Sequence, residues 1–289
     1  MKRKIFQILF ALIPNSYLKG FAQGKIYKGN LKYICAPGLN CYSCPGALVS
    51  CPIGSLQAIL SDIRYQFSFY VFGILILFGT IFGRWICGWL CPFGLIQELL
   101  HKIPSPKLKI LHHFWLKYLK YAILILFAIA LPMFWVNEIG LGSPAFCKYI
   151  CPAGTLEAGI PLVLSNPYLK NSIGLLFYWK IALLAATVLL SILLFRPFCR
   201  FLCPLGAIYG LFNWISACRL QLDKNQCIKC GRCRQKCKLD IPVYQKPNSP
   251  ECIRCGECIE SCPKGAIESR FPFWDSEKKR SSYPQFYDH

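Results

Sequence analysis

Charged residues are scarce in this sequence, and acidic residues are the scarcest. Only 16% of the 289 residues are charged, and 13 Asp and Glu stand against 33 Lys and Arg, which gives a net charge of +20. With 55% hydrophobic residues and a mean hydropathy of +0.40, this composition indicates a membrane protein. The basic residues surround apolar segments and form no recognition motif, which argues against binding to nucleic acid.

Common cofactor motifs are also missing. The sequence contains no C-x-x-C-H motif for covalent haem, no G-x-G-x-x-G motif and no phosphate-binding P-loop. These absences exclude the usual c-type haem and nucleotide sites. The chemistry of the chain must therefore depend on its 19 cysteines.

Eight of the cysteines lie in residues 227–262, where the pattern C-x2-C-x2-C-x3-C occurs twice. In two-cluster ferredoxins, three cysteines of one run and the last cysteine of the other ligate each [4Fe–4S] cluster. A zinc site would need only two C-x2-C pairs, and a disulfide framework would not repeat this spacing. We expect one cluster at Cys227, Cys230, Cys233 and Cys262, and a second at Cys252, Cys255, Cys258 and Cys237.

A Cys-Pro-x-Gly motif recurs along the chain, at Cys51, Cys91, Cys151, Cys203 and Cys262. Three copies carry another cysteine four residues earlier, at Cys87, Cys147 and Cys199. Proline suits the first turn of a helix, and the N–H groups of that turn would point at a thiolate. Metal ligation is therefore the favoured interpretation, and a simple break between helices at the membrane edge is the alternative.

Long apolar segments at 67–82, 121–136 and 173–195 predict three transmembrane helices. Cysteine pair, short helix and membrane helix then form an inexact internal repeat. We expect a mainly α fold: polytopic membrane helices with short re-entrant or interfacial helices at the Cys-Pro-x-Gly motifs, plus a small α+β ferredoxin domain of the bacterial two-[4Fe–4S] type. The expected divisions are an N-terminal interfacial segment with a Cys-rich loop (1–65), a membrane domain (66–217), the ferredoxin domain (218–270) and a tail (271–289).

Three spans would place successive cysteine pairs on alternate faces of the membrane. Cys87/Cys91 and Cys199/Cys203 would share the face of the ferredoxin domain and supply four thiolates for a further cluster. The pair Cys147/Cys151 would lie on the other face, beside the N-terminal loop that carries Cys35, Cys41, Cys44 and Cys51. There we expect metal ligation by Cys147, Cys151, Cys44 and Cys51, with the other two cysteines left over or paired as a disulfide.

The distribution of Lys and Arg orients the chain. Residues 84–120 carry six of them and residues 137–171 carry two, so the first loop and the ferredoxin domain should be cytoplasmic. The first 65 residues carry eight, yet three spans would place them outside. Insertion of the short N-terminal apolar segment as a fourth span would remove this conflict.

The motifs C-G-W-L-C-P-F-G at 87–94 and C-R-F-L-C-P-L-G at 199–206, with the paired ferredoxin runs, resemble the membrane-bound polyferredoxins of the NapH type. The same core occurs in the NosR membrane regulator and the CcoG oxidase-assembly protein. The resemblance covers residues 66–270 and implies an integral iron–sulfur protein of the inner membrane. That family usually has two C-x3-C-P motifs, so Cys147/Cys151 and the N-terminal cysteine loop are additions.

Two functions follow as expectations. The first is an electron-transfer subunit of an oxidoreductase complex, passing electrons between a cytoplasmic or quinone donor and a redox partner. The second is a membrane protein for metal-centre assembly or redox sensing. The expected partners are the membrane, redox subunits or a soluble electron donor, and quinone.

Overall fold

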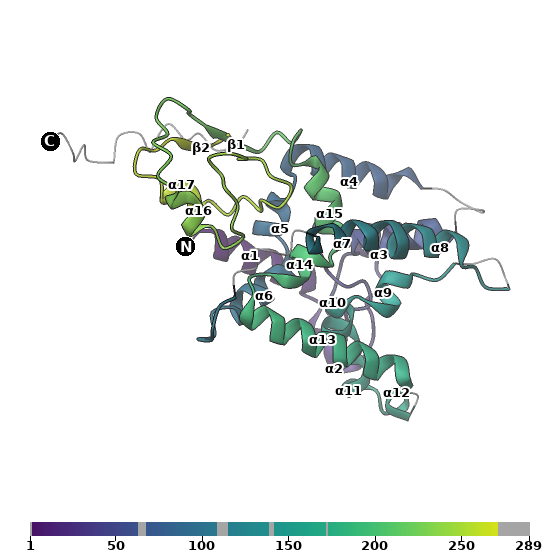
Figure 1. Ribbon diagram of the computed structural model, residues 1–289. Coiled ribbons are helices and arrows are strands. Elements are labelled where there is room, and N and C mark those ends of the chain that lie inside the picture. Colours follow the sequence, from purple (N-terminus) through teal and green to yellow (C-terminus); the bar gives the residue numbers. More distant parts are fainter. Residues whose placement is uncertain (1, 63–67, 109–114, 139–141, 172, 271–289) are drawn as a thin grey trace.

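The computed structural model describes residues 2–62, 68–108, 115–138, 142–171 and 173–270. The predicted tail, 271–289, lies outside the described residues. The described chain is mainly helical, with one small sheet near its C-terminal end (Figure 1).

Three long apolar helices run along a similar direction in Figure 1. They are α4 (Phe69–Phe82), the continuous run α7 (Leu116–Ile123), η3 (Leu124–Ala130) and α8 (Leu131–Phe134), and α13 (Leu175–Leu193). Leu116–Phe134 and Leu175–Leu193, 19 residues each, are long and apolar enough to cross a membrane. The third expected span is a shorter helix of 14 residues, α4, which ends where Gly83 turns to a φ of 55°.

The long helices expose apolar side chains. Ile125 and Leu189 are each 63% exposed, and Leu77 is 54% exposed. A helix bundle in water would turn such side chains inward, and exposed apolar surface on this scale marks contact with a partner or with lipid. The outward faces of these helices therefore suit a bilayer.

Short helices occupy the space between the long ones (Figure 1). They are α3 (Pro52–Ser61), α5 (Trp85–Trp89), α6 (Pro92–Leu100), α9 (Ala145–Tyr149), α10 (Pro152–Gly154) with η4 (Thr155–Gly159) and α11 (Ile160–Ser165), α14 (Pro197–Phe201) and α15 (Pro204–Phe212). Four of them, α3, α6, α10 and α15, begin at the proline of a Cys-Pro-x-Gly motif, with the cysteine as N-cap. This local prediction is confirmed.

The N-terminal segment packs against these short helices. It comprises α1 (Lys2–Leu12), η1 (Ile13–Asn15), α2 (Leu18–Gln23) and η2 (Asn30–Tyr33). A further short helix, α12 (Pro167–Asn171), does not belong to this segment and follows α11 in the sequence. Helix α1 contacts α5 and α6, and the buried Gln7 side chain donates a hydrogen bond of 2.9 Å to the carbonyl of Gly88. The N-terminus thus lies at the end of the molecule that carries the small sheet (Figure 1).

The C-terminal segment is held together by β1 (Arg219–Leu222), which pairs antiparallel with β2 (Ile267–Arg270). Helices α16 (Arg232–Lys236) and α17 (Glu257–Glu260) lie between the strands in sequence. The two cysteine loops share a conformation, since Lys229 and Arg254 both have a φ of 53°, and Gly231 and Gly256 are both left-handed. The repeated sequence pattern therefore produces a repeated loop.

One hydrophobic core runs from the short helices into the C-terminal segment. It contains cysteines from every group named above, including Cys51, Cys91, Cys151, Cys203 and Cys252. Alternate cysteine pairs were expected on opposite faces of the membrane. The short helices instead turn back between the long ones, so that both groups lie in the same interior.

Candidate metal centres

The first ferredoxin set lies where the spacing predicts. Cys227, Cys230, Cys233 and Cys262 all line one small cavity of the C-terminal segment. Cys230 is the only exposed cysteine of the chain, because every other cysteine is buried or half-buried. This set is therefore the one closest to solvent.

The second ferredoxin set is also brought together. Cys258 lies within electrostatic range of Cys252 and Cys255 in its own run and of Cys237 from the other run. Cys233 of the first set is also within electrostatic range of Cys258, so the crossing of Cys237 between the two runs stays a prediction.

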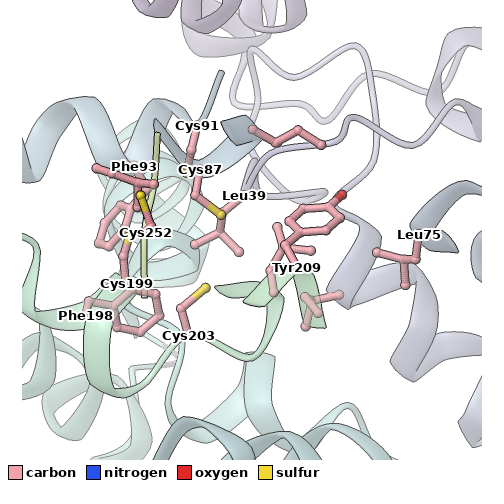
Figure 2. Close-up of a cluster of buried hydrophobic side chains, with 14 of the residues drawn as sticks. Leu39, Leu75, Cys87, Cys91, Phe93, Phe198, Cys199, Cys203, Tyr209 and Cys252 are labelled. Carbon is pink, nitrogen blue, oxygen red and sulfur yellow. The ribbon is translucent and has the colours of Figure 1, made fainter. Parts of the chain in front are cut away.

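A third set, here called the proximal site, consists of Cys87, Cys91, Cys199 and Cys203 (Figure 2). Cys91 lies within electrostatic range of Cys199, and Cys203 lies within electrostatic range of Cys87 and Cys91. The N–H groups of Gly94 and Gly206 each donate to the sulfur of the N-cap cysteine at 3.4 Å. The helix starts thus point N–H groups at the thiols, as the motif implies.

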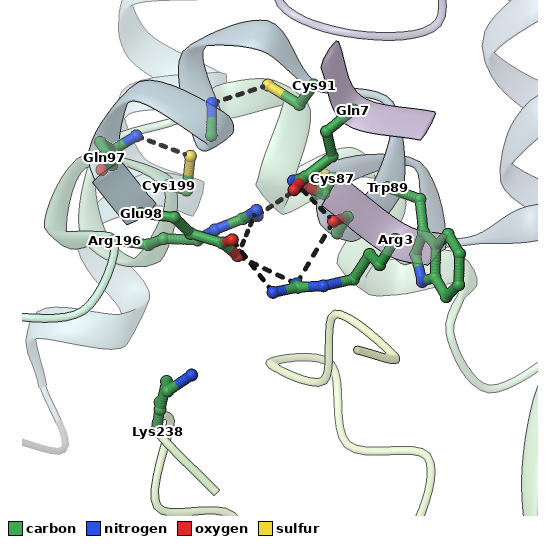
Figure 3. Close-up of polar contacts among 12 residues, drawn as sticks. Arg3, Gln7, Cys87, Trp89, Cys91, Gln97, Glu98, Arg196, Cys199 and Lys238 are labelled. Atoms are coloured by element: carbon green, nitrogen blue, oxygen red, sulfur yellow. Dashed lines mark hydrogen bonds and ion pairs between the residues drawn. The ribbon is translucent and has the colours of Figure 1, made fainter. Parts of the chain in front are cut away.

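Two buried arginines flank the proximal site. Arg196 donates to the carbonyl of Cys87, and Arg84 donates to the carbonyl of Cys199 at 3.1 Å. Arg196 pairs with Glu98 at 2.8 Å, and Arg3 of α1 pairs with the same carboxylate at 2.9 Å (Figure 3). Glu98 is therefore the counter-ion of two arginines.

A fourth set, here called the distal site, consists of Cys41, Cys51, Cys147 and Cys151. Cys151 lies within electrostatic range of Cys147 and Cys51, and Cys41 lies within range of Cys151 and Cys51. Cys44, expected as a ligand beside Cys51, lies within electrostatic range of Lys32 and Glu157. A tight turn, in which the N–H of Cys44 donates to the carbonyl of Cys41 at 3.1 Å, directs the two side chains differently.

Each set contains four cysteines, the number of thiolates that one [4Fe–4S] cluster takes. In the part of the chain that the structure describes, no three His, Cys, Asp or Glu side chains converge on one metal ion. A [4Fe–4S] cube binds its four thiolates at four iron atoms, so its ligands stand further apart than those of one ion.

The second ferredoxin set rests directly on the proximal site. A Cβ atom at Gly88 of α5 would lie 2.2 Å from the carbonyl oxygen of Ile253, so only glycine allows this approach. The indole N–H of Trp89 donates to the carbonyl of Arg254 at 3.0 Å. Arg84, whose Nη2 reaches Cys199, also donates through Nη1 to the carbonyl of Pro250 at 2.7 Å.

Comparison with known proteins supports the binding of [4Fe–4S] clusters by this chain. A family described as 4Fe-4S binding domain matches residues 66–110, 119–161 and 176–221, and a second family of the same description matches 248–268. An uncharacterized protein of Methanocaldococcus jannaschii is 34% identical over 72% of this chain and 79% of its own length. The chain belongs to the 4Fe-4S binding family of this relative.

More distant members of the family carry functional names. Regulatory protein NosR of Pseudomonas aeruginosa is 26% identical over 56% of this chain but only 21% of its own length. The methylamine utilization ferredoxin-type protein MauN of Methylorubrum extorquens is 27% identical over 57% of this chain and half of its own length. No solved structure matches the chain. The predicted [4Fe–4S] cofactors and the role in electron transport are confirmed at the level of the family.

The family matches also confirm the internal repeat. Each of the three matched segments contains one long apolar helix, the C-x3-C-P pair that follows it and the start of a short helix. Residues 1–65, with Cys41 and Cys51, lie outside all of the matches. Sequence reasoning missed the buried side chains that hold these sites, above all Arg84, Arg196 and two glutamines described below.

Proposed function

We propose that this protein is an integral-membrane electron relay. Electrons pass between a redox partner at the solvent-facing ferredoxin set and the proximal site between the membrane helices. The ligands proposed for the ferredoxin clusters are the two sets of four cysteines predicted from the spacing. The ligands proposed for the proximal cluster are Cys87, Cys91, Cys199 and Cys203.

The contact between the 250–254 loop and α5 carries this proposal. Electron transfer requires neighbouring centres, and the loop that contains Cys252 lies directly on the helix that contains Cys87. Arg84 strengthens the contact, because its guanidinium bridges Glu251 and the carbonyl of Cys199. Gly88 supports this proposal, because the close approach of the Ile253 carbonyl to α5 leaves no room for a Cβ atom at that position.

The membrane arrangement is part of the proposal. Helices α4, α7–α8 and α13 would cross the inner membrane, with the ferredoxin segment on the cytoplasmic side. The exposed apolar side chains of these helices and the Lys and Arg of residues 84–120 support it. The short helices would lie within the bilayer between the long ones, where both cysteine sites are shielded from water.

The alternative function, metal-centre assembly or redox sensing, has less support. It requires thiols that a partner can reach, and the N-terminal loop was the expected place for them. Cys35, Cys44 and Cys51 are all buried there. A partner could reach them only after this loop had opened.

Iron analysis and EPR-monitored redox titration of anaerobically purified protein test the relay. We expect Cys199→Ala to lose about four iron atoms per chain relative to the wild type, with the ferredoxin signals retained. A wild-type content of only about eight iron atoms would confine the clusters to the ferredoxin segment and overturn the proposal.

A further inference from the structure

The residue six positions after a Cys-Pro cysteine is glutamine in two copies of the motif, Gln57 after Cys51 and Gln97 after Cys91. Both side chains are fully buried, at 0% and 1% exposure. A buried amide needs hydrogen-bond partners. The partners of these two side chains therefore identify the segment against which each glutamine-bearing helix packs.

Gln97 forms hydrogen bonds to the first turn of α14, the helix that contains Cys199 (Figure 3). The backbone N–H of Phe198 donates to its Oε1 at 3.2 Å, and its Nε2 donates to the sulfur of Cys199 at 3.1 Å. The same Nε2 also contacts the carbonyl of Phe93, one turn back on its own helix, at 3.4 Å. The helix that follows Cys91 is thereby fixed to the cysteine pair that completes the proximal site.

Gln57 makes the same three contacts with the other cysteine pair. The N–H of Phe146 donates to its Oε1 at 2.9 Å, and its Nε2 donates to the sulfur of Cys147 at 3.2 Å. The contact within its own helix is with the carbonyl of Ile53, at 3.2 Å. Helix α3 is therefore hydrogen-bonded to the Cys147/Cys151 pair in the same way as α6 is hydrogen-bonded to the Cys199/Cys203 pair.

This equivalence identifies three cysteines of the distal site, and Cys41 supplies the fourth. The N-terminal motif lacks a cysteine four residues before Cys51, where Ala47 stands. Cys41 enters from the preceding loop, and a Cβ atom at Gly154, in the motif that Cys151 begins, would lie 3.6 Å from its sulfur. Glu157, six residues after Cys151, accepts the backbone N–H of Cys41 at 2.7 Å and holds the loop in place.

We propose that the distal site is a second buried [4Fe–4S] site, ligated by Cys41, Cys51, Cys147 and Cys151. This inference rests on the proposed relay and extends it by one centre, with half of the ligands in a segment that no family match covers.

The two buried sites are neighbours. Cys203 of the proximal site lies within electrostatic range of Cys151 of the distal site. Tyr209, fully buried, lies within range of cysteines of both sites and donates to the carbonyl of Pro37 at 3.0 Å. Clusters held by these two sets of cysteines would supply one-electron chemistry at neighbouring sites, with no bond made or broken.

Cys41→Ala and Cys44→Ala form a matched pair of tests, because the two residues belong to one loop and only Cys41 is a proposed ligand. After anaerobic purification and dithionite reduction, we expect Cys41→Ala to lose about four of about sixteen iron atoms and one EPR signal. Cys44→Ala should keep the wild-type iron content and spectrum. The ferredoxin signals report in both variants that the chain has folded.

The outcomes separate this inference from the relay itself. Full iron content in Cys41→Ala, with loss in Cys199→Ala, would overturn the distal site and leave the relay standing. Equal loss in Cys41→Ala and Cys44→Ala would also overturn the assignment, since the loop and not the ligand would then matter. Gln57→Leu should alter the distal EPR signal alone, and an altered proximal signal in its place would contradict the pairing of α3 with Cys147.

Discussion

Neutralising Glu251 should loosen the ferredoxin segment from the membrane helices. One oxygen of this carboxylate lies 2.5 Å from Lys120 of α7, and the other lies 2.9 Å from Arg84. The two cationic side chains are only 0% and 2% exposed. Glu251→Gln would leave both cations buried without a counter-ion, and removal of one partner from a buried ion pair costs about 3–5 kcal/mol.

That loss is large enough to measure as a melting temperature. At about 2–4 °C per kcal/mol for a protein of this size, Glu251→Gln should lower Tm by roughly 6–20 °C. Glu257→Gln is the matched control, because its ion pair with Lys238 is exposed by 25% and 46% and such pairs contribute under about 1 kcal/mol. Thermal unfolding of both variants in the same detergent makes the comparison. Equal shifts in Tm would refute the view that the buried network holds the two parts together.

Three further substitutions probe the path between the sites. Gly88→Ala should force the Ile253 loop away, cost about 1–3 kcal/mol and weaken the EPR coupling between the ferredoxin segment and the proximal site; Gly73→Ala, which has open space, should leave the coupling unchanged. Gln97→Leu removes a donor to a cysteine sulfur and should lower the reduction potential of the proximal site in a redox titration; an unchanged potential would contradict that role. Cys218→Ala should retain all the iron, because Cys218 belongs to none of the four sets, and a loss of iron would show an unforeseen ligand.

Features set by neighbours in sequence were predictable. The C-x2-C-x2-C spacing determines a short loop, and residues at equivalent positions of both copies have the same left-handed backbone conformation. In four of the five Cys-Pro-x-Gly copies the proline begins a helix, so the starts of α3, α6, α10 and α15 followed from the motif, whereas Pro263 begins none. The family resemblance depended on these same local patterns.

Only the tertiary structure decided which cysteines share a site in the interior. The sequence by itself determined the cofactor class, the ferredoxin loops and the helix starts, since these depend on residues a few positions apart. The choice of Cys41 over Cys44 depends on one turn, and the pairing of α3 with Cys147 depends on the reach of Gln57 across the core. Such contacts join segments far apart in the chain, and the apolar pattern of the helices does not specify them.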